Sequence, residues 1–212
     1  VYGQSLAKVQ SITEVPAKDT ADRDTDTMQT DVSFEHVTFA YPNKQDSALC
    51  DVCLQFPKGS HTAIVGESGS GKSTLASLMM GFWQPQAGTV RLGSENLAEL
   101  SERNIADFFS MVQQEVFLFN MSIRDNIRIG KPSAMQEEVE TAARRARIHD
   151  FIVGLPNGYD TSAGEAGVKF SGGEKQRISI ARAILKNASI VILDEATASI
   201  YPENEHLIQQ AI

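Results

Sequence analysis

The stretch Gly66-Glu67-Ser68-Gly69-Ser70-Gly71-Lys72-Ser73-Thr74 decides the fold of this chain. It matches the pattern G-x-x-x-x-G-K-S, in which glycines let the backbone curl closely around a bound group. The apolar run 62–65 before it predicts a buried strand, and residues 74–80 after it predict a helix. Between a strand and a helix, curled amides and the helix N-terminus form a positively polarised cradle for phosphate. We therefore predict a P-loop, rather than a flexible Gly/Ser turn, in which Lys72 reaches the β- and γ-phosphates and the Ser73 hydroxyl holds Mg²⁺.

Length and composition indicate a globular domain. The chain has 212 residues, of which 42% are apolar and 22% charged, enough for one sizeable core. Its net charge of −8 argues against a nucleic-acid surface as its main partner. The sequence contains no apolar run long enough for a membrane span, and its start lacks the features of a signal peptide. The first residue is Val1 rather than Met, which is consistent with a piece of a longer chain.

Cys50 and Cys53 stand in C-x-x-C spacing. A redox pair or half of a zinc site is one interpretation. No second C-x-x-C and no neighbouring histidine cluster accompany them, so we favour two small buried residues beside a strand at 52–56.

The N-terminal third divides into three parts. Residues 1–14 carry apolar side chains at loose helical spacing, and residues 15–31 are rich in Asp and Thr and predict an acidic linker. The folded domain is predicted to begin at Val32. Alternating apolar residues predict a strand from there to Tyr41, with a bulge at His36.

The middle of the chain is predicted to be mainly helical after a further short strand at 89–92. Gln136 opens a helix with acidic residues in its first turn and arginines in its last, as the helix dipole favours. Before it lies an apolar patch that is either core or a surface for docking a partner helix. Its residues are Phe117, Leu118, Phe119, Ile123, Ile127 and Ile129.

Two segments near the C-terminal end complete the pattern. Ser171 is predicted to open a long helix that ends near Asn187. The continuous apolar run 189–193 predicts a strand buried on both faces, and it ends in Asp194-Glu195. Ligands bind at the carboxyl ends of strands in open α/β sheets, so these two acids are interpreted as part of a ligand site. The alternative is that they only mark a solvated strand end. Asp194 is predicted to orient water around Mg²⁺, and Glu195 to act as general base for the attacking water.

Taken in order, these motifs resemble the nucleotide-binding domain of an exporter-type ATP-binding cassette transporter, over roughly residues 31–212. Phe170-Ser171-Gly172-Gly173-Glu174 resembles the signature motif L-S-G-G-Q, and residues 190–195 resemble the Walker B strand with its catalytic glutamate. Gln114 resembles the Q-loop glutamine, with Gln113 as the adjacent alternative. Two further resemblances are Tyr41 to the aromatic residue that stacks on adenine, and residues 161–167 to the exporter-specific loop before the signature.

The resemblance implies an α/β fold. Its parts are a P-loop NTPase core with a mostly parallel sheet, an antiparallel β subdomain near the N-terminus, and a helical subdomain at about 95–185. The nucleotide-binding domain is expected to span 32–212, with residues 1–14 as the tail of a preceding membrane helix. The implied activity is hydrolysis of ATP with Mg²⁺. The implied site comprises catalytic Glu195, Lys72 and Gln114, and the metal-holding oxygens of Ser73, Gln114 and Asp194.

The resemblance also implies partners. Ser171, Gly172 and Gly173 are expected to meet ATP held by the P-loop of a second nucleotide-binding domain, identical or different. The region between Phe117 and Ile127 is expected to contact membrane helices, which places the domain at the cytoplasmic face of the plasma (inner) membrane and makes substrate efflux the implied outcome.

Departures from the family pattern suggest an alternative. Tyr201 occupies the position of the D-loop aspartate, and the chain is expected to end before the position of the family's switch histidine. The covering strands that end such a domain are also expected to be missing, so the domain is expected to be incomplete at its C-terminus. The alternative is a degenerate or truncated half that binds Mg-ATP but hydrolyses little. A non-transport cassette ATPase would carry long insertions or basic arms, and a P-loop kinase would not need the Ser171-Gly172-Gly173 helix start.

Overall fold

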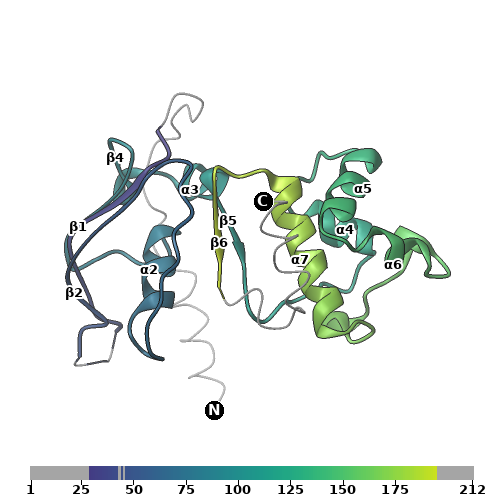
Figure 1. Cartoon of the computed structure of the whole chain (residues 1–212), viewed down its shortest axis with the longest axis horizontal. Coiled ribbons are helices and arrows are strands. Elements are labelled where there is room, and N and C mark those ends of the chain that lie inside the picture. The colour runs from purple at the N-terminus through teal and green to yellow at the C-terminus, as the bar shows by residue number, and fades with distance from the viewer. Residues whose placement is uncertain (1–28, 43, 45, 195–212) are drawn as a thin grey trace, which may run out of the picture.

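The computed structural model describes residues 29–42, 44 and 46–194, so the predictions for 1–14, most of the linker 15–31 and residues 195–212 lie outside it. Its strands are β1 (Val32–Phe39), β2 (Leu49–Phe56), β3 (Ala87–Leu92), β4 (Glu95–Asn96), β5 (Phe109–Val112) and β6 (Ile190–Leu193). Its α-helices are α2 (Lys72–Met79), α3 (Glu102–Phe108), α4 (Ile123–Arg128), α5 (Gln136–Arg145), α6 (His149–Val153) and α7 (Gly172–Lys186). Short 3-10 helices are η1 (Leu97–Glu99), η2 (Gly158–Asp160) and η3 (Glu165–Gly167). In Figure 1 the antiparallel sheet stands at one end and α4–α7 at the other, with α2, β5 and β6 between them.

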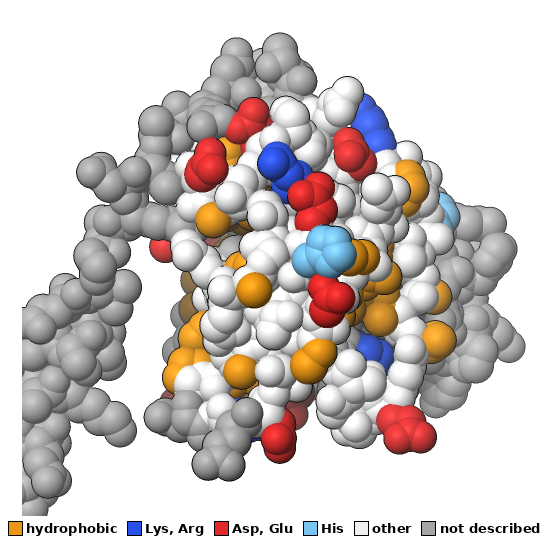
Figure 2. Space-filling model, turned by 90° about the vertical axis from the view of Figure 1, so that its left-hand side faces the viewer, with side chains coloured by type: hydrophobic (Ala, Val, Ile, Leu, Met, Phe, Trp, Pro, Cys, Tyr) orange, Lys and Arg blue, Asp and Glu red, His pale blue; other side chains and the backbone are white. Residues whose placement is uncertain are grey.

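The antiparallel sheet has the order β2-β1-β3-β4 and confirms the predicted strands near the N-terminus. Its inward side is apolar because the side chains of β1 alternate between core and surface, as a pleated strand requires. The predicted bulge is confirmed, since the register shifts between Phe34 and Val37 and His36 has a φ of 52°. Asp51 of β2 also has positive φ, and its Oδ1 lies 2.8 Å from Nδ1 of His36. On the outer face of this end of the molecule, apolar and charged side chains are interspersed (Figure 2).

Gly88 marks the closest approach of β3 to the bulge. Its φ is 80°, and a Cβ at this position would lie 2.3 Å from the carbonyl oxygen of His36 and 2.4 Å from that of Glu35. We expect Gly88→Ala to lower the free energy of unfolding by at least about 2 kcal/mol, because backbone strain and overlap add. Urea unfolding measures this change.

Gly59→Ala is the matched control, since Gly59 has a φ of 72° and nothing within 4 Å of its Cβ position. It is expected to cost only the strain of a left-handed residue, about 1 kcal/mol. Equal losses in the two variants would contradict the role assigned to the close contact at Gly88.

A first core joins the antiparallel sheet to α2 and α3. Leu75, Leu78 and Met79 of α2 are buried against the sheet, so the predicted helix after the glycine loop is confirmed and packed. Ile105 and Phe108 of α3 belong to the same core. The first part of the range predicted for the helical subdomain therefore packs with the sheet.

β5 and β6 form a two-stranded parallel sheet, with Phe109 opposite Ile190 and Val112 opposite Leu193. The strand predicted at 189–193 is confirmed over Ile190–Leu193, and β5 was not predicted. The expectation of burial on both faces is wrong within the described residues, because β6 is only half-buried and Leu193 is exposed. Ile190 and Ile192 pack against the first core.

A second core lies among α4, α5, α6 and α7. The predicted helix from Gln136 is confirmed as α5, and the predicted helix after Ser171 as α7. Ser171 and Glu174 form a capping box at the start of α7, and Asn187 ends it in the left-handed conformation. Ile178 and Ala181 are fully buried on the face that α7 turns to this core.

The prediction of a strand immediately before the glycine loop is wrong. Residues 61–65 are in neither described sheet, and the Val65 side chain is 87% exposed. An apolar run indicates that its side chains tend to be buried. A strand forms only where a neighbouring strand pairs with its backbone N–H and C=O groups. In the described part of the chain no strand pairs with this run.

The prediction that the two cysteines are buried is also wrong. Cys50 and Cys53 lie within β2, and both are exposed and free of disulfides. The backbone N–H of His36 donates to Sγ of Cys53 at 3.3 Å.

Among the described residues, none of the helices combines the length and hydrophobicity that a membrane span requires.

Candidate functional site

The glycine loop leads into α2 as the sequence predicts. Gly71 is the N-cap of α2 with a φ of 94°, which favours glycine. A Cβ on Gly71 would lie 2.8 Å from Cδ2 of Leu49 and 2.9 Å from the Ala48 carbonyl oxygen. The loop therefore turns tightly against the start of β2, and its residues 66–70 remain exposed.

Lys72 folds back over the loop. Its ammonium donates to the carbonyl oxygens of Gly66 and Glu67, each at 2.8 Å. The cation is thus held beside the exposed backbone that the motif assigns to phosphate binding. The Ser73 side chain next to it is exposed, so its hydroxyl is open to a ligand.

Tyr41 lies beside the loop in an aromatic group. Its ring packs edge-on against Phe39 at 5.0 Å and Trp83 at 5.6 Å between centroids. Its hydroxyl lies 3.1 Å from Oγ1 of Thr74, the last residue of the motif. This contact joins the segment after β1 to the first turn of α2.

Trp83 and Gln86 are positioning residues that the sequence analysis did not single out. Trp83 is 40% exposed and touches both Tyr41 and Phe39. The Gln86 side chain accepts from the Ala40 amide and donates to the Ala40 carbonyl, both at 2.7 Å. That Trp83 is the single tryptophan of the chain is a weak indication in the sequence that it belongs to the site. No pattern in the sequence indicates that Gln86 contacts Ala40, a residue 46 positions earlier.

The predicted acidic and amide residues meet at the carboxyl ends of β5 and β6. Asp194 follows β6, and its amide donates to the Val112 carbonyl at 3.0 Å. Gln113 and Gln114 follow β5 on the adjacent strand and are exposed. The strand ends therefore bring Asp194 and these glutamines to one edge, as parallel pairing requires. The expected general base Glu195 and the D-loop residue Tyr201 lie outside the described residues.

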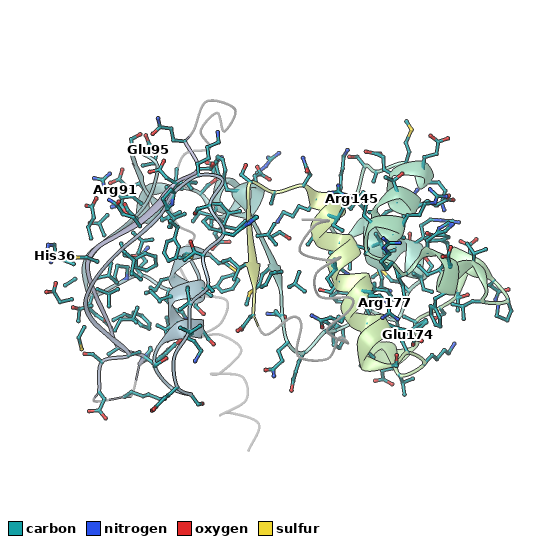
Figure 3. The ribbon with its side chains drawn as sticks, viewed as in Figure 1. His36, Arg91, Glu95, Arg145, Glu174 and Arg177 are labelled. Carbon is teal, nitrogen blue, oxygen red and sulfur yellow. The ribbon has the colours of Figure 1, made fainter. Side chains whose placement is uncertain are left out.

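The signature segment forms the exposed N-terminus of α7. The Ser171 amide donates to Oε2 of Glu174 at 2.7 Å, and the Glu174 amide donates back to Oγ of Ser171 at 3.4 Å. A Cβ on Gly172 would meet nothing within 4 Å, so the backbone there is open to a ligand. Glu174 and Arg177 lie along the same end of the helix (Figure 3).

The apolar patch after the Q-loop divides between core and surface. Leu118, Ile123 and Ile127 are fully buried in the second core. Phe117 and Phe119 are 56% and 47% exposed, and their rings pack edge-on at 5.1 Å. We call this exposed pair the Phe117/Phe119 surface.

The loop predicted to precede the signature packs on the same region. The Ile123 amide donates to the Thr161 carbonyl at 3.0 Å, and the Ala163 amide donates to the Met121 carbonyl at 2.9 Å. Lys175 of α7 donates to the Ala166 carbonyl at 3.0 Å. Residues 161–167 therefore join the start of α4 to the start of α7.

The oxygen donors that the sequence predicts for the metal are of the kind that suits Mg²⁺ bound together with phosphates. Within the described ranges, no three His, Cys, Asp or Glu side chains are arranged to hold a metal ion by themselves. Mg²⁺ usually takes only one or two protein oxygens and completes its shell with phosphate and water. A hydroxyl at Ser73, an amide at Gln114 and a carboxylate at Asp194 are all hard oxygen donors, so the residues fit the ion.

Comparison with known proteins gives concordant similarities. A sequence profile of the ABC transporter family matches residues 49–198. ABC transporter B family member 1 of Arabidopsis thaliana is 47% identical over 182 residues, which is 85% of this chain and 14% of the plant protein. An ATP-dependent lipid A-core flippase of Chromohalobacter salexigens is 48% identical over 181 residues, covering 85% of this chain and 31% of the flippase.

A solved structure shows the same fold. A bacterial Atm1-family ABC exporter with ATP bound superposes with a TM-score of 0.86 at 35% identity, over 97% of this chain and 36% of the exporter chain. The present chain thus spans about a third or less of each relative named here.

Proposed function

Because the chain belongs to the ABC transporter family, we propose that it binds and hydrolyses MgATP to drive export through attached membrane helices. Membership makes it an ATPase domain of the P-loop class. The observation that carries the proposal is the P-loop itself, in which Gly71 opens α2 and Lys72 lies over the loop carbonyls.

The proposed chemistry divides among three groups of residues. Residues 66–74 hold the phosphates, with Lys72 on the β- and γ-phosphates and Tyr41 against the adenine. Asp194, Gln114 and Ser73 hold Mg²⁺, which when bound neutralises charge on the phosphates. Glu195 takes a proton from the water that attacks the γ-phosphate.

We further propose that two such domains close around ATP. Ser171, Gly172 and Gly173 would contact the γ-phosphate held by the partner's P-loop, because amides at a helix N-terminus favour an anion. The exposed Gly172 backbone and the capped Ser171 support this assignment. The partner domain is a second copy or a related chain.

The contact with membrane helices is assigned to the region between Phe117 and Ile127. Exposed aromatic side chains next to one another are typical of docking surfaces, and the Phe117/Phe119 surface has this character. This contact would place the domain at the cytoplasmic face of the plasma (inner) membrane. The alternative function, a half that binds Mg-ATP but hydrolyses little, is favoured by Tyr201 in the D-loop position.

Glu195→Gln tests the proposal in the full-length transporter. We expect kcat for ATP hydrolysis to fall about 10²-fold or more while MgATP binding remains, because the amide cannot accept the proton. Phosphate release and nucleotide binding are the measurements. Glu137→Gln, at an exposed position of α5, is the control and should leave kcat unchanged. Unchanged turnover in Glu195→Gln would remove Glu195 as the base, and negligible turnover in the parent protein would favour the alternative function.

A further inference from the structure

We propose that Arg182 and Asn126 form a rigid connection that couples the Phe117/Phe119 surface to the signature segment at the N-terminus of α7. Both are positioning residues, and neither is among the residues assigned to nucleotide binding. The inference rests on the proposed function, in which the first surface contacts membrane helices and the second contacts ATP of the partner domain.

Arg182 of α7 directs three nitrogens toward the segment before and within α4. Its Nη1 donates to the Phe117 carbonyl at 2.9 Å. Its Nε donates to the Asn126 carbonyl at 2.7 Å, and its Nη2 donates to Oδ1 of Asn126 at 2.7 Å. The planar guanidinium thus fixes the backbone at Phe117 and both oxygens of Asn126 in one geometry.

Asn126 extends the same network to the rest of the loop. It is fully buried, and its Nδ2 lies within hydrogen-bond distance of the carbonyls of Phe119, Met121 and Ser122 at 3.0, 3.3 and 3.0 Å. Its Oδ1 accepts from the Phe119 amide at 2.9 Å in addition to Arg182. One side chain therefore sets the backbone that carries Phe119, while Arg182 sets the backbone that carries Phe117.

The setting of the network makes it stiff. Burial lowers the pKa of Arg182 to about 10, and its three acceptors are uncharged oxygens. Asn126 is fully buried, so leaving its amide unpaired would carry the full cost of its desolvation, and the arrangement resists opening at this residue. The turn after α4 also approaches α7 closely, since a Cβ on Gly130 would lie 2.3 Å from the Arg182 carbonyl oxygen.

Helix α7 carries the connection to the signature. Gly172 lies ten residues before Arg182, a distance of about 15 Å along one uninterrupted helix. The same helix contacts both ends of β5, because Gln176 donates to the Gln113 carbonyl at 3.4 Å and Lys186 to the Phe109 carbonyl at 2.8 Å. A displacement of the Phe117/Phe119 surface must therefore move α7 as a body, and with it Ser171.

Hydrogen exchange of Arg182→Lys tests the connection in the 212-residue chain. Lys keeps the charge but loses the planar fork, so we expect amide exchange in residues 117–122 to rise about 10- to 100-fold. Exchange in 171–176 should rise with it, whereas β1, in the other core, should be unaffected. Arg144→Lys, at an exposed pair with Glu140, is the matched control and should change neither segment. Faster exchange in 117–122 with unchanged 171–176 would overturn the proposal.

A second measurement needs no substitution. In the wild-type chain with increasing MgATP, exchange in 117–122 and 171–176 should fall over the same concentration range. Protection confined to 171–176 would also overturn the connection. Absence of any MgATP-dependent protection, including at the P-loop, would instead count against the proposed function and leave the Arg182→Lys result as the test.

The kinetic consequence separates positioning from general destabilisation. In the full-length transporter, Arg182→Lys is expected to lower kcat for ATP hydrolysis about tenfold while KM for MgATP stays unchanged, because the P-loop is untouched. A parallel change in kcat and KM would indicate a damaged nucleotide site and contradict the assignment.

Discussion

Replacing Lys72 by Ala is expected to lower kcat for MgATP hydrolysis about 10³-fold. The Lys72 ammonium lies 2.8 Å from two loop carbonyls, so it is already positioned where the β- and γ-phosphates are expected. Negative charge that develops on the transferred phosphoryl group would lose its nearest protein cation. Phosphate release by the full-length transporter measures the effect, and nucleotide-dependent thermal stabilisation of the 212-residue chain measures binding.

Lys58→Ala is the control for this experiment. Lys58 is an exposed lysine in the turn after β2, so its removal changes the net charge equally. We expect hydrolysis by Lys58→Ala to stay within about twofold of the parent protein. If Lys72→Ala also stayed within that range, the assignment of the loop as the hydrolytic site would be wrong.

Replacing Ile178 by Ala is expected to lower the free energy of unfolding by about 2–5 kcal/mol. Ile178 is fully buried on α7 within the second core, where close packing leaves little room for relaxation around a cavity. The same helix carries the signature segment, so the loss also weakens the support of the proposed site. Denaturant unfolding of the 212-residue chain measures the change as a lower midpoint.

Val168→Ala supplies the comparison, because Val168 is 77% exposed and its truncation removes two side-chain carbons, against three at Ile178. Its effect should lie within about 0.5 kcal/mol of zero. If Ile178→Ala lowered the free energy of unfolding as little as Val168→Ala does, the second core would not be packed as described.

Local patterns predicted the elements that depend on local chemistry. Ser171 predicted the start of α7, and the structure shows why: its hydroxyl accepts from the Glu174 amide while the Glu174 carboxylate accepts from the Ser171 amide. The slip in alternation at His36 predicted the bulge in β1, since an extra residue must take up the break in a strict period of two. The glycine and lysine spacing predicted the turn into α2.

Elements that depend on distant partners were not predicted correctly. The run 62–65 is apolar enough for a strand, but pairing depends on a neighbour that no local pattern specifies. β5 was not predicted because it is short and begins directly after α3, which masks its own period. β6 was predicted to be more buried than it is, because composition indicates hydrophobicity and not the presence of a covering layer.

The candidate site shows the same division. The sequence indicated Lys72, Ser171 and Asp194, because a motif holds the chemistry of each within a few residues. It gave no indication that Gln86 fixes the backbone before Tyr41, or that Arg182 pairs with Asn126. Those pairs are 46 and 56 residues apart, and only the folded chain brings them together.

The exposed thiols of β2 have a practical consequence. Cys50 and Cys53 are the only cysteines of the chain, and both are exposed on β2 of the antiparallel sheet. Aerobic storage can therefore cross-link two molecules through these sulfurs, and such covalent pairs would run as dimers in sizing columns without any nucleotide. A thiol reductant breaks the disulfides of these covalent pairs but leaves an ATP-dependent association intact, so the two kinds of dimer can be distinguished. The same thiols accept maleimide dyes at a location remote in sequence from the signature, which provides optical reporters that leave residues 171–174 unmodified.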